Sequence, residues 1–283
     1  MKWGFQPRRQ GNGGVQSADA CSLSPPAVPG ARVIPWAPLG RAPIPGTDQS
    51  LCLYRRGELL EFSIQISGYV SELMNSRQHA SEDALADLAC AAIAGRARPH
   101  VLVGGLGMGF TLAAALKALG PGSAVTVAEL VPEVVEWNQG PLGECAGYPL
   151  RDPRTRVHVG DVAELLRRGN SVYDAVLLDV DNGPEGMTHH GNDWLYSPPG
   201  LAAAQRTLRP GGVLAVWSAT PESRFTTRLN RAGFRVEVHT VRARPGKGAH
   251  HTVWLAHAPG GKAVGSAGQA AGQSAQGRRS GGR

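Results

Sequence analysis

The feature that most constrains the fold is an alternation, from residue 100 onward, of short apolar runs and helix-length amphipathic stretches. This alternation is typical of a parallel α/β sheet in which a helix follows each strand. The run AVLLD at residues 175–179 is almost entirely apolar, as expected of a central strand covered on both faces. The predicted strands are His100–Val103, Ala124–Glu129, Arg156–Val159, Tyr173–Val180 and Gly212–Ser218, and the predicted helices are Gly109–Leu119, Pro132–Asn138, Val162–Arg168 and Gly200–Leu208.

The flanking segments follow other patterns. After a predicted helix at Pro221–Ala232, the segments Phe234–Ala243 and His251–His257 predict two antiparallel strands joined by a Pro-Gly turn. Residues 48–70 predict a small β-hairpin, and Ser71–Ala94 predicts a helix. The predicted fold class is therefore α/β: a Rossmann-like, mostly parallel seven-stranded sheet with a terminal antiparallel hairpin, of the class I S-adenosylmethionine-dependent methyltransferase type, preceded by a small N-terminal β-hairpin region.

Composition separates two tails from the rest. Residues 1–30 and 259–283 consist mainly of Gly, Ser, Gln, Ala and Pro and are predicted to be disordered. The first tail holds three basic residues and one acidic residue, and the second holds four basic residues, so the tails carry +6 of the formal net charge of +7. The remaining residues are nearly neutral, which argues against a nucleic-acid partner for the folded part.

The sequence also argues against a membrane protein, a disulfide framework and a metal site. No stretch approaches 18 apolar residues and the N-terminus lacks the apolar run of a secretory signal, so no membrane partner and a cytoplasmic location are expected. An organelle transit peptide stays open, because the N-terminus bears arginine and few acids. The cysteines at 21, 52, 90 and 145 are scattered, which argues against a zinc site and a disulfide framework. The pairs His189-His190 and His250-His251 lack the further ligands that a metal site needs, so no metal is expected.

The strongest local motif is VLVGGLGMG at residues 101–109, which runs from a predicted strand into a predicted helix. Glycines there let the backbone approach a ligand, and the helix N-terminus offers free N–H groups. Glu129 ends the next strand, where a carboxylate can accept hydrogen bonds from both hydroxyls of a ribose. In a dinucleotide motif, GxGxxG, the third glycine would stand at Phe110, but here it falls one place early, at Gly109, so the spacing favours an S-adenosyl cofactor. The loop glycines are Gly104, Gly105, Gly107 and Gly109.

Two more acids end predicted strands. Asp161 could accept a hydrogen bond from an adenine amino group, or cap the helix that follows it. Asp179 opens a Gly/Pro-rich loop at the carboxyl edge of the sheet, where open α/β sheets bind their ligands. Trp217 and Trp254 lie on predicted strands and are expected in the core.

Five segments, taken in order, resemble the polyamine aminopropyltransferases, the spermidine synthase family. They are GGLGMG, VAELVPEVVEWN, DPRTRVHVGD, YDAVLLDVDNGPEG and LYSPPGLAAAQRTLRPGGVLAVWS, within residues 100–220. The resemblance implies an aminopropyl transfer from decarboxylated S-adenosylmethionine to a small amine, without a metal, by a chain that can form a homodimer. It assigns Asp179 as general base, the four loop glycines and Glu129 to the cofactor, and Asp161 with Val162 to the adenine. The implied domains are residues 31–95, a small N-terminal β-hairpin and helix region, and residues 96–258, an S-adenosyl-cofactor-binding transferase domain.

The sequence departs from the family pattern where the amine would bind. The acid of the family motif GGGDGG is replaced by Gly107, and the family triplet Tyr-His/Gln-Glu appears as Ser81-Glu82-Asp83, in which Asp83 could stand in for the acid. Methyl transfer from S-adenosylmethionine to a small molecule therefore stays open as an alternative. A non-catalytic nucleoside-binding relative is disfavoured, since the strand-end acids are retained. The candidate substrate-binding residues are Glu82, Asp83, Asp181, Asn182 and Tyr196.

Overall fold

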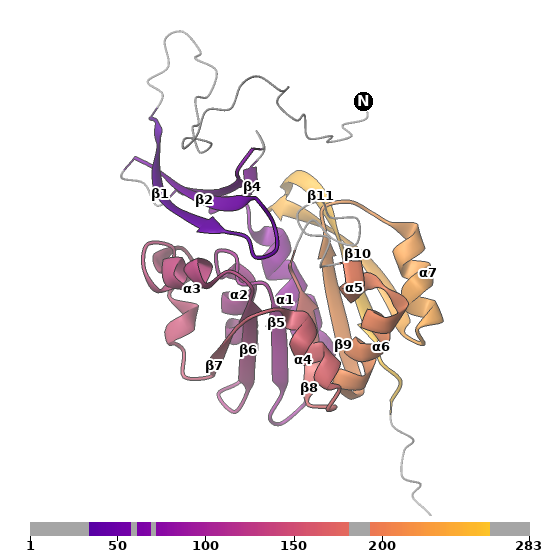
Figure 1. Ribbon diagram of the computed structural model, residues 1–283. Coiled ribbons are helices and arrows are strands. Elements are labelled where there is room, and N and C mark those ends of the chain that lie inside the picture. The colour runs from indigo at the N-terminus through magenta and orange to yellow at the C-terminus, as the bar shows by residue number, and fades with distance from the viewer. Residues whose placement is uncertain (1–33, 58–60, 69–71, 181–192, 261–283) are drawn as a thin grey trace, which may run out of the picture.

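The computed structural model describes residues 34–57, 61–68, 72–180 and 193–260 (Figure 1). Its larger sheet has seven strands in the order β10-β11-β9-β8-β5-β6-β7. All pairs from β9 to β7 are parallel, and β11 pairs antiparallel with both β9 and β10. The predicted arrangement of five parallel strands with a closing hairpin is confirmed. The strands are β5 (His100–Gly104), β6 (Ala124–Glu129), β7 (Thr155–Val159), β8 (Tyr173–Leu178), β9 (Leu208–Ser218), β10 (Arg235–Arg244) and β11 (Lys247–His257).

Helices cover both faces of this sheet (Figure 1). Alternate residues of the central strands supply the two cores: Val101 and Val103 pack with α1, α2 and α3, whereas Leu102 packs with α4, α6 and α7. This alternation is the pleat of a strand buried on both faces. The helices are α1 (Ala80–Ala92), α2 (Phe110–Ala118), α3 (Pro132–Gln139), α4 (Val162–Arg168), α5 (Asp193–Tyr196), α6 (Pro198–Thr207) and α7 (Ser223–Arg231), with short 3₁₀ turns at Gly143–Ala146 and Pro149–Arg151.

Local sequence explains where several helices begin and end. Pro132 and Pro198 occupy the first turns of α3 and α6, where a missing N–H costs nothing. Ser197 caps α6 by accepting a hydrogen bond from the Gly200 N–H at 3.3 Å. Gly169 ends α4 in the left-handed conformation that glycine favours.

The N-terminal region is a four-stranded antiparallel sheet, not the predicted small hairpin. Its strands β1 (Trp36–Pro43), β2 (Ser50–Arg56), β3 (Glu61–Ile66) and β4 (Glu72–Asn75) pair in sequence order. Only β2 and β3 lie in the predicted hairpin. Strand β1 contains Pro38 and Pro43 and has a register shift between Pro38 and Gly40, which its position at the edge of the sheet permits.

The prediction of a helix over Ser71–Ala94 is wrong in its first part. Residues 72–75 pair with β3, with Met74 opposite Ile64, and α1 begins only at Ala80. The Asn75 side chain donates to Glu72 Oε2 and accepts from the Arg77 N–H, at 2.7 and 3.0 Å. These side-chain hydrogen bonds favour a turn over a helix, which separates β4 from α1.

Two other expectations can be compared with the described residues. Cys90 and Cys145 are free, but Cys52 is disulfide-bonded, which the expectation from cysteine spacing did not include. In the described part of the chain, no helix is long and apolar enough to cross a membrane. Most of both predicted tails lies outside the described residues, so their disorder and the proposed domain boundaries stay predictions.

Candidate functional site

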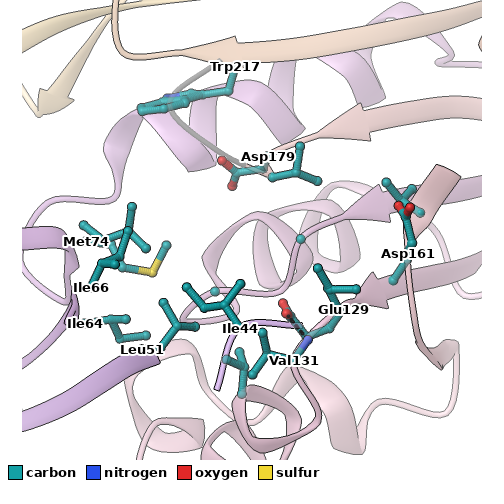
Figure 2. Close-up of a pocket in the computed structure, with 18 of the residues that line it drawn as sticks. Ile44, Leu51, Ile64, Ile66, Met74, Glu129, Val131, Asp161, Asp179 and Trp217 are labelled. Carbon is teal, nitrogen blue, oxygen red and sulfur yellow. Dashed lines mark hydrogen bonds between the residues drawn. The ribbon is translucent and has the colours of Figure 1, made fainter. Parts of the chain in front are cut away.

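A cavity of about 180 Å³ lies between the N-terminal sheet and the carboxyl ends of the parallel strands. Figure 2 shows the apolar side chains Leu51, Ile64, Ile66 and Met74 on one side of it, contributed by β2, β3 and β4. The ends of β6 and β8 and the start of α4 supply acids: Glu129, Asp161 and Asp179 all line the cavity. The three strand-end acids predicted from the sequence are therefore brought to one site.

The glycine loop between β5 and α2 forms part of the cavity wall. The Gly105 N–H donates to the Ala128 carbonyl at 2.9 Å, and Gly105 has φ +89°. A Cβ on Gly105 would overlap the Asp179 carbonyl oxygen and lie 2.9 Å from its carbon. Only glycine permits this close approach of two backbones. Gly104 ends β5, Gly107 has φ +52° and lines the cavity, and Gly109 is the N-cap of α2 in the left-handed conformation.

Asn138 holds this loop from α3. Its side-chain N–H₂ donates to the Gly107 carbonyl at 2.8 Å and to the Val134 carbonyl at 2.9 Å. The residue is fully buried, and these two hydrogen bonds satisfy the side-chain N–H₂ group away from water. Sequence reasoning did not identify Asn138, because a single Asn in an amphipathic helix carries no local pattern that points to the loop.

Glu129 is buried, with 8% of its surface exposed. Its Oε2 accepts from the Leu106 N–H and its Oε1 from the Val131 N–H, both at 2.9 Å. Burial raises the pKa of Glu129, and the backbone N–H donors oppose that shift by stabilising the anion. The backbone N–H groups of Gly107 and Leu130 act in the same sense as those of Leu106 and Val131. Glu129 lines the cavity as predicted, and its contact with a ribose stays a prediction.

Asp161 caps a helix and also faces the cavity. Its Oδ1 accepts from the Ala163 N–H at 2.8 Å, which makes it the N-cap of α4. Asp161 and Val162 also line the cavity. The helix-cap interpretation is therefore confirmed, and the adenine contact stays a prediction.

Asp179 follows β8 at the centre of the cavity edge. Its N–H donates to the Gly104 carbonyl at 2.9 Å, and its Oδ2 accepts from the Thr111 hydroxyl at 2.6 Å. Burial raises the pKa of Asp179 to about 6, while the Thr111 hydrogen bond lowers it. A carboxyl poised in this range can exchange a proton near neutral pH.

Glu82, on the first turn of α1, lines the cavity together with Asp179. Burial and the nearby Asp179 charge raise the pKa of Glu82 to about 7. Both carboxyls also line a side chamber of about 20 Å³, whose walls include Met74, Phe110 and Thr111. Two close carboxyls with raised pKa values favour holding one proton between them.

Not every predicted site residue reaches this cavity. Asp83, predicted as the stand-in acid, bonds to His79 Nδ1 at 2.8 Å and does not line the cavity. Glu82 takes that place because adjacent helical residues point about 100° apart. Tyr196 is buried and packs edge-on against Phe225, with ring centroids 5.6 Å apart, so the structure gives it a packing role. Asp181 and Asn182 lie outside the described residues.

The two tryptophans differ from each other. Trp254 is fully buried in the core as predicted, whereas Trp217 is partly buried, packs against the core and also lines the cavity. Trp217 is the penultimate residue of β9, whose end reaches the cavity, whereas Trp254 lies within β11. The described residues contain no cluster of three or more His, Cys, Asp or Glu side chains that could hold a metal ion.

Comparison with known proteins gives a consistent picture. No family model matches the sequence. A polyamine aminopropyltransferase of Prochlorococcus marinus is 27% identical over 134 residues, which cover 47% of this chain and 45% of that relative. A polyamine aminopropyltransferase of Mycobacterium tuberculosis is 30% identical over 160 residues, or 53% of this chain and 29% of the relative.

Solved structures agree in fold. The spermidine synthase of Thermotoga maritima matches with a TM-score of 0.61 and 17% identity, over 78% of this chain and 72% of that one. A spermidine synthase in complex with the transition-state analogue AdoDATO matches with a TM-score of 0.60 and 16% identity, over the same shares. This chain is a divergent, spermidine-synthase-like protein.

The spermidine-synthase-like chain spans less than half the length of the curated relatives it matches. The structural likeness extends over a larger share and includes the α/β sheet that positions the cavity. At 16–17% identity, this likeness establishes the fold and not the reaction.

Proposed function

We propose that this chain transfers an aminopropyl group from decarboxylated S-adenosylmethionine to a small-molecule amine, with Asp179 as general base. The observation that carries the proposal is the placement of Asp179 in a cavity that also holds Glu129 and Asp161. The relatives named as polyamine aminopropyltransferases support the same reaction class.

The residues present suit an S-adenosyl donor. Glu129 would accept the ribose hydroxyls, Asp161 and Val162 would contact the adenine, and the Gly105–Gly107 loop would pass beside the sulfonium. The donor supplies a carbon already activated by a good leaving group. The protein must therefore align the amine with that carbon and remove a proton.

Asp179 can perform both tasks on the acceptor. As an anion it attracts the ammonium form of the amine, and it then takes the proton that the amine nitrogen loses. The Thr111 hydroxyl fixes one carboxylate oxygen by its 2.6 Å hydrogen bond, which leaves the other oxygen to face the amine. Thr111 is thus a positioning residue for the base.

The cavity walls indicate an acceptor with an apolar body. Among the described lining residues, Glu82 and Asp179 share the side chamber, while Glu129 and Asp161 hold backbone N–H groups at other points. Opposite them the wall is apolar, and a Cβ on Gly107 would lie 2.9 Å from Met74 Cε, so Met74 packs where the related motif has an acid. An amine with one cationic end and an apolar remainder fits this distribution better than a diamine.

Methyl transfer from S-adenosylmethionine is the second candidate. The surroundings of Gly107 support it, because the position has no amine-binding acid and a Cβ there would already meet Met74 Cε. The same loop and the same Glu129 would hold either nucleoside donor.

Ligand-dependent thermal stability separates the two candidates. We expect methylthioadenosine to stabilise the chain, by about 2.7 kcal/mol at a hundred times its dissociation constant. We expect S-adenosylhomocysteine to stabilise it less, because the aminopropyl donor lacks a carboxylate. Stabilisation chiefly by S-adenosylhomocysteine would favour methyl transfer, and no effect of either ligand would contradict the nucleoside site. The full reaction is then followed as methylthioadenosine release with hexylamine and with putrescine.

Replacing Glu129 with Gln should weaken methylthioadenosine binding by about 1–3 kcal/mol, because charged hydrogen bonds to the ribose become neutral ones. Isothermal titration calorimetry measures the change. The control is Glu133→Gln on α3, the same chemical change outside the cavity lining. Equal affinity of both variants and the wild type would place the ribose elsewhere.

A further inference from the structure

A chain of hydrogen bonds leads from the cavity to His251 on β11. The Ser81 hydroxyl donates to Glu82 Oε2 at 2.5 Å, and His251 Nδ1 lies 2.9 Å from Ser81 Oγ. Because Ser81 has a single hydroxyl proton and gives it to Glu82, the ring nitrogen must be the donor in the second bond. Three polar groups from α1 and β11 are thereby connected in a line.

The position of each group suits passage of a proton. Glu82 lines the cavity with Asp179, Ser81 is completely buried, and His251 is half-buried beside the exposed His250. Trp217, which lines the cavity, contacts the His251 ring edge-on with centroids 4.8 Å apart. Trp217 is thus in contact with both the cavity and the His251 ring, while hydrogen bonds connect the ring to the cavity through Ser81 and Glu82.

We propose that Glu82, Ser81 and His251 form a relay that carries the proton taken up by Asp179 out of the cavity. The inference rests on the aminopropyl transfer proposed above, which releases one proton from the amine nitrogen for each bond formed. None of the three groups needs to contact the donor nucleoside, so the relay is separate from nucleoside binding.

The proton balance is as follows. The amine nitrogen loses its proton to Asp179 as its new bond to carbon forms, and Asp179 passes the proton to Glu82 within the cavity that both line. Transfer starts from the Nε2–H tautomer of His251, in which Nδ1 can accept: protonated Glu82 donates to Ser81 Oγ, the Ser81 hydroxyl proton moves to Nδ1, and the proton on Nε2 leaves to solvent. Afterwards Nδ1 carries the proton and Ser81 donates to Glu82, as observed. The chain resets when water returns a proton to Nε2 and takes the one on Nδ1, which restores the Nε2–H tautomer.

The surroundings of the two ends determine where the proton leaves. Burial and the charges of Asp179 and Asp83 raise the pKa of Glu82, and the Ser81 hydrogen bond opposes them. Burial and the neighbouring His250 lower the pKa of His251, so the ring does not retain a proton near neutral pH. Because this order of pKa values opposes transfer from Glu82 to His251, loss of the proton from Nε2 to solvent must drive the relay outward.

The first test uses the free chain and needs no turnover. Nitrogen-15 spectra of the His251 ring should show the Nδ1–H tautomer in the neutral wild type. We expect Ser81→Ala to shift the ring toward the Nε2–H tautomer, and Glu82→Gln to lower the titration midpoint of His251. His250→Ala, the matched control on the same strand, should leave the His251 tautomer unchanged. Identical His251 spectra in the wild type, Ser81→Ala and Glu82→Gln would overturn the relay.

The second test measures turnover. His251→Ala should lower kcat about tenfold or more, with unchanged stabilisation by methylthioadenosine. Added imidazole should restore kcat, whereas pyrazole, which has the same shape but is a far weaker base, should not. Wild-type kcat in His251→Ala, or equal rescue by both compounds, would contradict the relay. A wild-type chain that releases no methylthioadenosine would contradict the proposed function instead, and the ring spectra would still decide whether the three groups are coupled.

Discussion

Asp179→Asn is expected to abolish turnover while leaving methylthioadenosine binding close to that of the wild type. The amide has nearly the same shape and can still accept the Thr111 hydrogen bond, but it neither attracts an ammonium group nor takes a proton. General-base catalysis contributes about 10²–10⁴-fold, which sets the expected fall in kcat. Single-turnover release of methylthioadenosine measures the effect, and calorimetry with the same nucleoside measures binding.

The pH profile makes this expectation specific to a titrating carboxyl. Because the Asp179 pKa is raised to about 6, the base is protonated and inactive below that pH, and wild-type turnover should rise as pH increases through it. The same shift stabilises the protonated native state relative to the unfolded chain, so its contribution to stability is lost as pH rises through the folded pKa. Both trends should weaken in Asp179→Asn.

The matched control is Asp87→Asn, the same chemical change at an exposed position on α1. It should leave kcat and its pH profile unaltered. Wild-type turnover in Asp179→Asn would remove this residue as the base and leave Glu82 as the carboxyl to test.

Local patterns were sufficient for the central sheet. The predicted bounds of Ala124–Glu129 and Val162–Arg168 agree with the structure. The first is a short run rich in β-branched residues, and the second is a helix flanked by Asp161 and Gly169, so local sequence marks the limits of both. Strands β1 and β4 were not predicted. Their prolines, glycine and polar residues lack a two-residue period, and it is pairing with β2 and β3 that makes them strands.

The candidate site was likewise predictable from the sequence only in part. Glu129, Asp161 and Asp179 could be placed together because the carboxyl ends of parallel strands share one edge of the sheet. Glu82 was named as a candidate only together with its neighbour Asp83, and Trp217 was not placed at the site, since the direction of each side chain depends on the orientation of its helix or strand at the cavity. A sequence shows that Ser81, Glu82 and Asp83 are adjacent, but only the orientation of the helix shows that Glu82 reaches the cavity and Asp83 does not.

Gly105→Ala is expected to have the second large effect, on both stability and nucleoside binding. The added Cβ would overlap the Asp179 carbonyl oxygen, and backbone atoms cannot move aside as a flexible side chain can. Either the glycine loop or the backbone at Asp179 must shift, which would separate the base from the donor site. We expect a loss of about 3 kcal/mol or more in the free energy of unfolding, since left-handed strain and overpacking add.

Gly95→Ala separates the effect of left-handed backbone strain from the effect of overpacking. Gly95 has φ +91°, close to the +89° of Gly105, but a Cβ there would meet nothing within 4 Å. This control should therefore cost only about 1–2 kcal/mol of left-handed strain and leave methylthioadenosine binding unchanged. Chemical denaturation and calorimetry of the two variants measure the difference. Equal losses would mean that backbone conformation alone requires glycine at 105, whereas a larger loss with weakened binding in Gly105→Ala would show that contact between the loop and Asp179 shapes the site.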